Sequence, residues 1–206
     1  MSARNRRAAG RRAPSNDTAV VRAEFEQIVA GVPGRARMLA TMLDWAIDAT
    51  HADMGIVQIV DPRDGSLRIA AQHGFRAPFL AFFRVVTNDA SASSIAMRRG
   101  TQIVVPNVRV SSLYSEPARA AMLDAHACAC QSTPIASSGG RVLGVVSTHF
   151  GRPRRPTQRQ LRRVSLMARL VATLLERPRM APPAVDVTII VDEIRDGSPK
   201  TRTIRG

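Results

Sequence analysis

Residues 128–150, CACQSTPIASSGGRVLGVVSTHF, contain two strand-like runs on either side of a turn. The runs are Cys128–Ala136 and Arg141–Phe150, and the second is rich in Val and other residues that favour β-structure. The residues between them, Ser137-Ser138-Gly139-Gly140, are typical of a tight turn. The stretch therefore predicts a β-hairpin.

The polar side chains of this hairpin share one face if its loop has an even number of residues. Ser147 and His149 are two residues apart, so they lie on the same side of their strand. A two- or four-residue loop puts Cys128, Cys130 and Ser132 on that side as well. Either cysteine would then lie opposite His149. A loop with an odd number of residues would send the cysteines to the other face.

A second hairpin and a further strand come before this one. The runs Gly55–Val60 and Leu67–Ala71 flank Asp61-Pro62-Arg63-Asp64-Gly65, a Pro/Asp/Gly turn whose two aspartates we expect to be solvated. Thr101–Val105 has the pattern of another strand, ended by Pro106. Two neighbouring hairpins favour an antiparallel sheet.

Helical periodicity appears on both sides of the strand-rich region. One helix is expected from Asp17 or Thr18 to Ala30, and a second over Arg35–Thr50. A closing helix begins at Thr157, whose spacing to Gln160 fits a capping box, and it ends before Pro178. Shorter helices are expected at Pro78–Val86, Ser91–Arg99 and Pro117–Ala127. We expect an α+β fold with the long helices on one face of the sheet and the short helices over a cavity on the other.

The two ends of the chain differ from this region. Residues 1–16 are basic and predict a disordered arm, whereas residues 178–206 begin as a Pro-rich linker and continue as a β-like tail. The domain is therefore expected to span residues 17–177. No apolar run reaches the roughly 20 residues of a membrane span, which favours a soluble, cytoplasmic protein.

The net charge of +14 comes almost entirely from arginine, since only Lys200 among the 30 basic residues is a lysine. Arginine binds phosphate well, and Arg152-Pro153-Arg154-Arg155 forms a basic stretch at the start of the closing helix. However, aromatic residues make up only 4% of the chain, so stacking platforms for single strands are scarce. The composition does not favour nucleic acid as the partner.

Three motifs follow one another along the chain. The first is Gly55–Pro62 with Gly65-Ser66-Leu67 and Gln72–Phe75, and the second is Ser91–Ala96 with Arg98-Arg99-Gly100. The third combines Gln131–Ile135, Leu143-Gly144-Val145, Ser147–Phe150, Arg152-Pro153 and Pro156. In order and spacing, residues 35–177 resemble the GAF domain of bacterial signalling proteins, especially the version attached to histidine kinases. Many relatives carry Cys-Gly where this chain has Ser93-Ser94.

The resemblance implies a six-stranded antiparallel sheet between a helical bundle and a ligand pocket. Family members bind small molecules or tetrapyrroles, or serve as signalling and dimerisation modules. One GAF subfamily reduces free methionine sulfoxide with cysteines, but the two cysteines of this chain do not match its pattern.

Three interpretations of the polar hairpin face remain open. The face is a packed strand pair in which cysteine acts as a small hydrophobe and His149 is hydrogen-bonded. Alternatively, it lines a pocket. In the third interpretation, His149 lowers the pKa of a thiol for redox or nucleophilic chemistry. The candidate ligand-binding residues are Gln58, Cys130, Ser132, Ser147 and His149.

No metal site is expected, because His126, Cys128 and Cys130 are spread too far along an extended strand to converge on one ion. The sequence assigns no cofactor, and haem ligation by His73, His126 or His149 stays open.

The sequence therefore predicts a non-catalytic sensor or regulatory module that binds an unidentified small molecule. We expect a homodimer formed through the long helices. Residues 179–206 are too few for an output domain, so a separate signalling protein is expected to receive the signal. The alternatives are a thiol-redox enzyme and a ligand-free scaffold whose cavity is filled by Phe79, Phe82 or Phe83.

Overall fold

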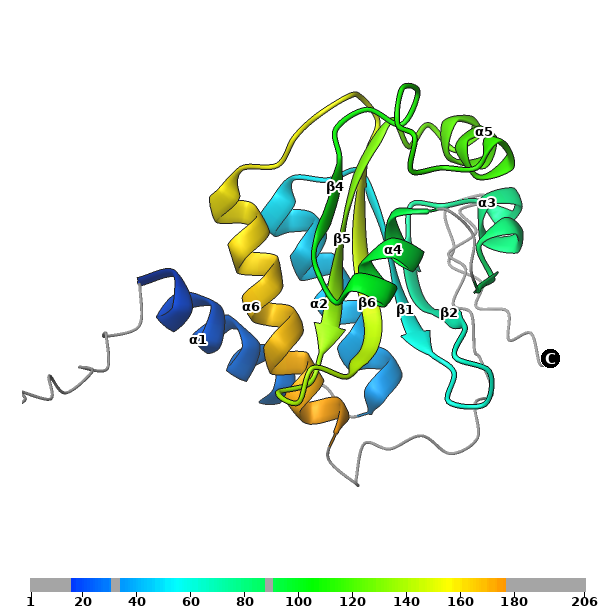
Figure 1. Cartoon of the computed structure of the whole chain (residues 1–206). Helices are drawn as coiled ribbons and strands as arrows, with labels where there is room; N and C mark the ends of the chain where they lie inside the picture. The colour runs from blue at the N-terminus through cyan, green and yellow to red at the C-terminus, as the bar shows by residue number, and fades with distance from the viewer. Residues whose placement is uncertain (1–15, 31–33, 88–90, 177–206) are drawn as a thin grey trace, which may run out of the picture.

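The computed structural model describes residues 16–30, 34–87 and 91–176 (Figure 1). Its helices are α1 (Asn16–Ala30), α2 (Arg35–Thr50), α3 (Ala77–Phe82), α4 (Ala92–Arg99), α5 (Glu116–Asp124) and α6 (Gln158–Leu175). Its strands are β1 (Met54–Val60), β2 (Leu67–His73), β3 (Val85–Val86), β4 (Ile103–Val105), β5 (Ala129–Ala136) and β6 (Val142–Phe150). The predicted arm and tail lie outside the described residues, apart from Asn16, which begins α1.

The strands form one sheet in the order β3-β2-β1-β6-β5-β4, and every neighbouring pair is antiparallel. The two predicted hairpins, β1–β2 and β5–β6, meet at the centre, where Ile56 lies opposite Ser147. The six-stranded antiparallel sheet of an α+β fold is therefore confirmed.

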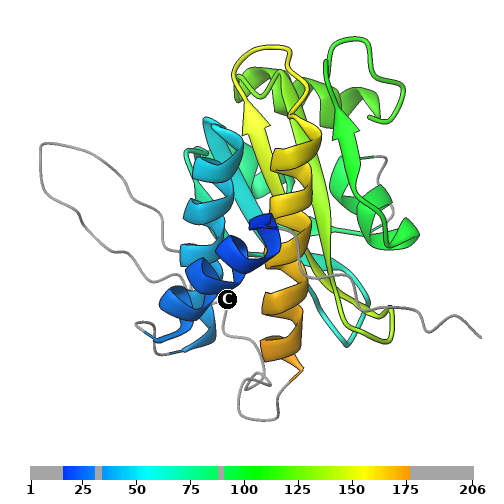
Figure 2. The ribbon, with the colours of Figure 1, turned by 90° about the vertical axis from the view of Figure 1, so that its left-hand side faces the viewer.

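Helices cover both faces of this sheet. Helices α2 and α6 pack on one face, and α1 crosses over them on the outside (Figure 2). The short helices α3, α4 and α5 cover the other face (Figure 1). Alternation along the strands supplies both cores: Val146 packs against the long helices, whereas Val145 faces the short ones.

Side chains cap the N-terminal ends of α4, α5 and α6, and the cap of α6 is the one predicted from the sequence. Thr157 and Gln160 form a reciprocal capping box at the start of α6. The Ser91 side chain caps α4, and Gly100 ends it in the left-handed conformation, which glycine adopts without strain. Ser115 caps α5.

The arginines near the start of α6 mostly bind the chain itself. Arg159 pairs with Asp17 of α1 at 2.9 Å, and Arg163 pairs with Glu24 at the same distance. The Glu24 carboxylate also accepts a hydrogen bond from the Trp45 indole of α2. These contacts attach α1 to the other two long helices, so Arg159 and Arg163 have a structural role.

The loop of the β5–β6 hairpin has an odd number of residues. An even number was the condition for placing the cysteines on the same face as His149. Ser137 N–H donates to the carbonyl of Arg141, which leaves residues 138–140 as the loop, with Gly140 at φ 83°. A β-bulge between Ile135 and Ala136 then shifts the register by one residue. The bulge compensates for the odd loop and returns the cysteine-bearing strand to the expected facing.

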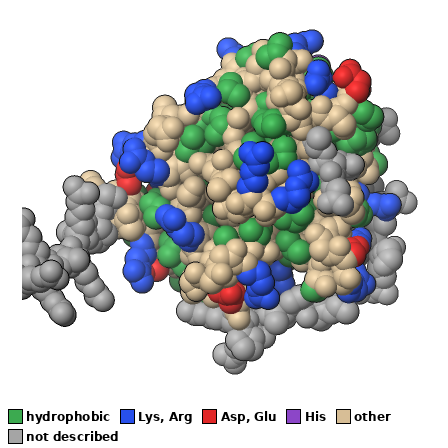
Figure 3. All heavy atoms as spheres, viewed as in Figure 1, with side chains coloured by type: hydrophobic (Ala, Val, Ile, Leu, Met, Phe, Trp, Pro, Cys, Tyr) green, Lys and Arg blue, Asp and Glu red, His purple; other side chains and the backbone are tan. Residues whose placement is uncertain are grey.

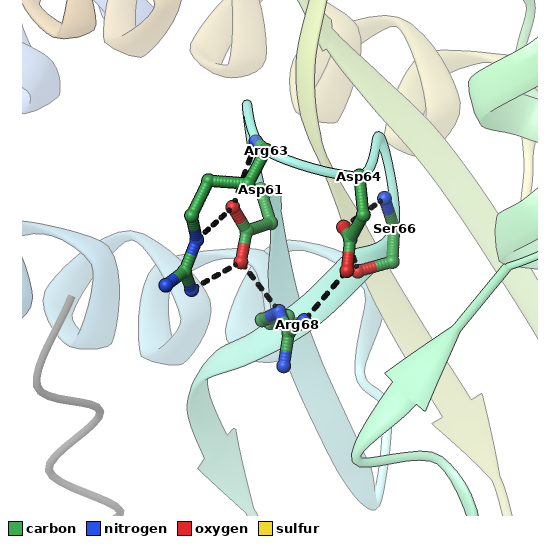
Figure 4. Close-up of polar contacts among 5 residues, drawn as sticks. All are labelled: Asp61, Arg63, Asp64, Ser66 and Arg68. Carbon is green, nitrogen blue, oxygen red and sulfur yellow. Dashed lines mark hydrogen bonds and ion pairs between the residues drawn. The ribbon is translucent and has the colours of Figure 1, made fainter. Parts of the chain in front are cut away.

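The turn between β1 and β2 differs from the expected solvated pair of aspartates. The Asp61 carboxylate is only 1% exposed and lies between Arg63 and Arg68, each at 2.7 Å (Figure 4). Hydrogen bonds from Arg63 hold the pKa of Asp61 well below its ordinary value. Asp64 is more exposed and contacts Ser66 and Arg68. The two arginines therefore neutralise a buried carboxylate that staples the hairpin.

The predicted helix over 78–86 is shorter than expected. Helix α3 ends at Phe82, and Val85–Val86 form β3, which pairs with the beginning of β2. The run PFLAFFRVV is apolar almost throughout, so it was assigned to a single helix. Its final two valines favour β-structure, and this preference was overlooked.

Candidate functional site

The polar face of the β5–β6 hairpin lies under the short helices. Cys130 is opposite His149, and Ser132 is opposite Ser147. The two serine hydroxyl oxygens are 2.7 Å apart and share a hydrogen bond. His149 is 4% exposed and both serines are 1% exposed. The structure therefore places these four predicted site residues together on one buried face.

A cavity of about 10 Å³ lies against this face, which is enough for roughly one water molecule. Its polar lining comes from Ser91, Ser93, Tyr114, Ser132, Ser147 and His149, and its apolar lining from Ile56, Phe79, Phe83, Ala92 and Met122. Among these described residues, none carries an acidic or strongly basic side chain. The space expected for a ligand is thus almost filled.

Aromatic rings from α3 and its flanks fill that space. The Phe75 and Phe79 rings are stacked, with centroids 3.7 Å apart and planes 5° apart. Phe83 packs against Phe79 at 4.6 Å. The His149 imidazole meets Phe75 edge-on at 5.0 Å. Phe82, which was also among the residues expected to fill the cavity, points outward and is 42% exposed.

The His149 imidazole is neutral at ordinary pH. Desolvation by burial lowers its pKa from 6.5 to about 3. Its Nδ1 atom is buried and has no hydrogen-bond partner among the residues that the structure describes. An unpartnered polar atom in a protein interior costs free energy, so this atom offers a ready contact to any ligand that can approach it.

Cys130 pairs with Tyr114 on the same face. The Tyr114 hydroxyl oxygen lies 3.1 Å from the Cys130 Sγ, and the thiol is fully buried. Burial raises the pKa of Cys130 to about 12 and also raises that of Tyr114. The Cys130 thiol therefore stays protonated and is a poor nucleophile.

Gln58 lies on the same face of the sheet but outside the cavity wall. Its amide Nε2 donates to the carbonyl of Phe83 at 3.4 Å, and its Oε1 is buried with no partner in the described part of the chain. Because Gln58 is opposite Val145, it sits four residues along β6 from His149. The structure thus places this predicted site residue in contact with Phe83, one of the aromatic residues that fill the cavity.

The opposite face of β5 and β6 carries a separate polar network. Thr148 contacts the Thr50 hydroxyl of α2 at 3.2 Å and accepts a hydrogen bond from the Gln131 amide at 3.1 Å. The side-chain oxygen Oε1 of Gln131 accepts a hydrogen bond from the Thr133 hydroxyl at 2.6 Å. This network ties the sheet to the long helices.

The family model described as the GAF domain matches residues 34–176. This chain belongs to the GAF domain family. The match agrees with the predicted span of 35–177 to within one residue at each end. No curated protein sequence matches the chain.

Solved structures show the same fold at low sequence identity. A sensor histidine kinase domain from Sinorhizobium meliloti is 18% identical with a TM-score of 0.60, covering 72% of this chain and 94% of that one. The GAF domain of an Acinetobacter phosphoenolpyruvate-protein phosphotransferase is 12% identical with a TM-score of 0.64, covering 79% and 94%. A free methionine-R-sulfoxide reductase from Neisseria meningitidis is 18% identical with a TM-score of 0.63, covering 82% and 96%.

The two thiols of this GAF domain differ in burial and are expected to differ in reactivity. Cys128 is half-buried, whereas Cys130 is buried. In the native protein at about pH 8, we expect iodoacetamide to modify Cys128 and to leave Cys130 almost unmodified until the chain unfolds. Intact-mass measurements on Cys130→Ser and Cys128→Ser variants compare the two thiols. Equal labelling rates in the two folded variants would contradict the buried, protonated thiol.

Tyr114, Ser91 and Ser93 belong to the cavity wall but were not predicted there. Tyr114 is the single tyrosine of the chain and lies in the loop before α5, where no periodic pattern marks it. Ser93 stands where many GAF relatives carry cysteine, so the departure from the family pattern was a usable signal for that residue.

The surface of the GAF domain carries dispersed positive charge. On the face seen in Figure 3, arginine side chains are separated by apolar and uncharged ones. Among the helices of the described residues, none is both long and apolar enough to cross a bilayer.

Proposed function

We propose that this GAF domain is a non-catalytic sensor that binds a small molecule in the cavity between the sheet and helices α3, α4 and α5. The observation that carries this proposal is that His149, whose buried Nδ1 has no hydrogen-bond partner among the described residues, is one of the residues lining the cavity. A polar atom buried without a partner is uncommon in folded proteins, and ligand binding is one reason for keeping it. The protonated Cys130 thiol argues against a thiol-redox enzyme.

Strand β6 provides a short route from the cavity to the long helices. Ser147 and His149 face the cavity, and Thr148 between them contacts Thr50 at the C-terminal end of α2. A ligand that displaces this part of β6 shifts the Thr148–Thr50 contact and, through it, the packing of α2 and α6. We expect these helices to form a homodimer in the cytoplasm and to pass the change to a separate signalling protein.

Amide NMR on the whole chain tests the sensor proposal. A ¹⁵N-labelled sample is titrated with a library of small molecules that includes charged and uncharged members. Binding at the cavity is expected to shift the amides of residues 130–132 and 147–149, followed by those of Thr50 and the end of α2. If no library member shifts the first group, the sensor proposal is wrong.

A second candidate function is a ligand-free regulatory scaffold. The near-complete filling of the cavity by Phe79 and Phe83 favours it. In that case the rings of Phe75, Phe79 and Phe83 are a permanent part of the core. The same titration separates the two functions, because a scaffold leaves the cavity amides unchanged with every compound.

A further inference from the structure

Two hollows of very different size share one wall, the Phe79 side chain. The inner cavity holds about 10 Å³. An outer groove of about 900 Å³ lies between α3 and α5, with Arg76, Phe82, Pro117 and His126 among its lining residues. Phe79 lines both hollows, whereas its neighbour Phe82 lines only the groove. The Phe79 ring thus separates the groove from the polar face of β5 and β6.

We propose that Phe79 is a gate, and that the inner cavity accepts an uncharged aromatic ligand with a hydrogen-bond donor, which enters from the α3–α5 groove. This inference rests on the proposed sensor function and specifies its ligand class and its route. In the closed state the Phe79 ring occupies the place of the ligand ring. In the open state the ring swings into the groove.

The aromatic character of the ligand follows from the surfaces that the gate uncovers. Phe79 stacks face to face on Phe75 and also packs against Phe83, whose ring is tilted by 42°. A planar ring that replaces Phe79 regains the stacking on Phe75 and the edge-on contact that Phe79 makes with His149, at 6.0 Å between centroids. A bulky aliphatic molecule fits this slot poorly, because the Phe75 face is flat.

The polarity of the ligand follows from His149 and its surroundings. In the neutral tautomer protonated at Nε2, the unpartnered Nδ1 is an acceptor that a ligand N–H or O–H can satisfy. The described residues of the cavity wall offer no acidic or strongly basic side chain to pair with a charged ligand. Burial of an unpaired charge costs far more than one hydrogen bond returns, which selects an uncharged donor.

Phe79 belongs to helix α3, which can move at a small cost in free energy. Helix α3 has six residues, and its N-cap residue, Arg76, makes no side-chain capping hydrogen bond. Short helices of this kind depend on packing for their stability. The buried residues of α3 are Phe79 and Leu80, and Phe79 carries the aromatic contacts, so movement of Phe79 loosens the helix.

Indole is a suitable probe because it is planar, uncharged and carries one N–H donor. Its affinity is measured by amide NMR titration of the full chain for the wild type, Phe79→Leu and Phe82→Leu. Phe79→Leu reduces the cost of opening, so indole is expected to bind at least about tenfold more tightly than to the wild type. Phe82→Leu removes the same ring atoms from the groove alone and is expected to change the affinity less than about twofold.

Two further comparisons test the ligand class. Toluene lacks the donor and benzoate carries a charge, and both are expected to bind Phe79→Leu at least about tenfold more weakly than indole. A His149→Phe change in the Phe79→Leu background keeps an aromatic wall but removes the acceptor, and it should abolish the preference for indole over toluene. Thermal unfolding of each variant establishes that it is folded.

The outcomes separate this inference from the sensor proposal. Equal indole affinity in the wild type and Phe79→Leu, or an equal gain in Phe82→Leu, overturns the gate. Benzoate or toluene binding as tightly as indole overturns the ligand class. In both cases cavity amides still shift, so the sensor proposal survives. If no compound shifts those amides in either protein, both proposals fail together.

Discussion

Lowering the pH from about 7.5 to about 4.5 is expected to reduce the free energy of unfolding by about 3 kcal/mol through His149 alone. Burial lowers the pKa of this imidazole from 6.5 to about 3 in the folded protein. Between those values the unfolded chain binds a proton that the folded chain does not. Stability therefore falls as the pH drops through this window, and most of the loss lies above the range in which carboxylates titrate.

Urea unfolding at several pH values measures this effect. A His149→Leu variant removes the titrating group and should show a loss about 3 kcal/mol smaller than that of the wild type over the same interval. Ser147→Ala is the matched control, since it changes the neighbouring position on the same face without removing a titratable group. Equal pH slopes for the wild type and His149→Leu would show that the imidazole is not buried in the neutral form.

The Asp61 carboxylate does not confuse this measurement. Hydrogen bonds from Arg63 lower its pKa in the folded protein, so its contribution to stability is present above the unfolded value of about 4 and is lost as the pH falls further. The two groups therefore act in different windows. His149 controls the loss from about pH 6.5 to about pH 4.5, and Asp61 adds to it only in stronger acid.

Gly144→Ala is expected to destabilise the protein by about 3 kcal/mol, at the upper end of what overpacking usually costs. Gly144 lies opposite Ile59 at the junction of the two hairpins. A Cβ atom there would collide with the carbonyl oxygen of Gln58 and would lie 2.8 Å from the Cδ1 of Ile59. Because the first obstacle is backbone of the central β1 strand, the sheet itself would have to move.

Gly139→Ala is the matched control for this change. Gly139 lies in the loop of the same hairpin, and an added Cβ would meet only the Ser137 hydroxyl oxygen, at 3.9 Å. Its cost is expected to stay within about 0.5 kcal/mol. Chemical denaturation of the two variants compares them directly. A Gly144→Ala variant as stable as Gly139→Ala would contradict the close approach of β1 and β6.

Features that depend on residues close together in the sequence were easier to predict than features that depend on distant contacts. The boundaries of α2 and the capping box at Thr157 were predicted correctly, because they depend on residues close to one another in the sequence. Element order and motif spacing were likewise enough to identify the GAF fold. The short strand β3 was missed, because its two residues form a strand only by pairing with β2.

The candidate site depended more strongly on distant contacts. Alternation along two strands predicted that Cys130, Ser132, Ser147 and His149 share a face. The stated condition, an even loop, was nevertheless wrong, and a bulge at Ile135/Ala136 produced the same result. Local patterns cannot reveal such a bulge, because it is set by how the β5 and β6 ladders fit between β1 and β4.

Tertiary packing alone determines whether the polar face is open. The composition of residues 75–83 promised aromatic side chains, but the stacking of Phe79 on Phe75 and the outward position of Phe82 follow from how α3 docks on the sheet. Local chemistry thus specified the elements and the facing residues, whereas the filled cavity arises because side chains from distant segments compete for one space.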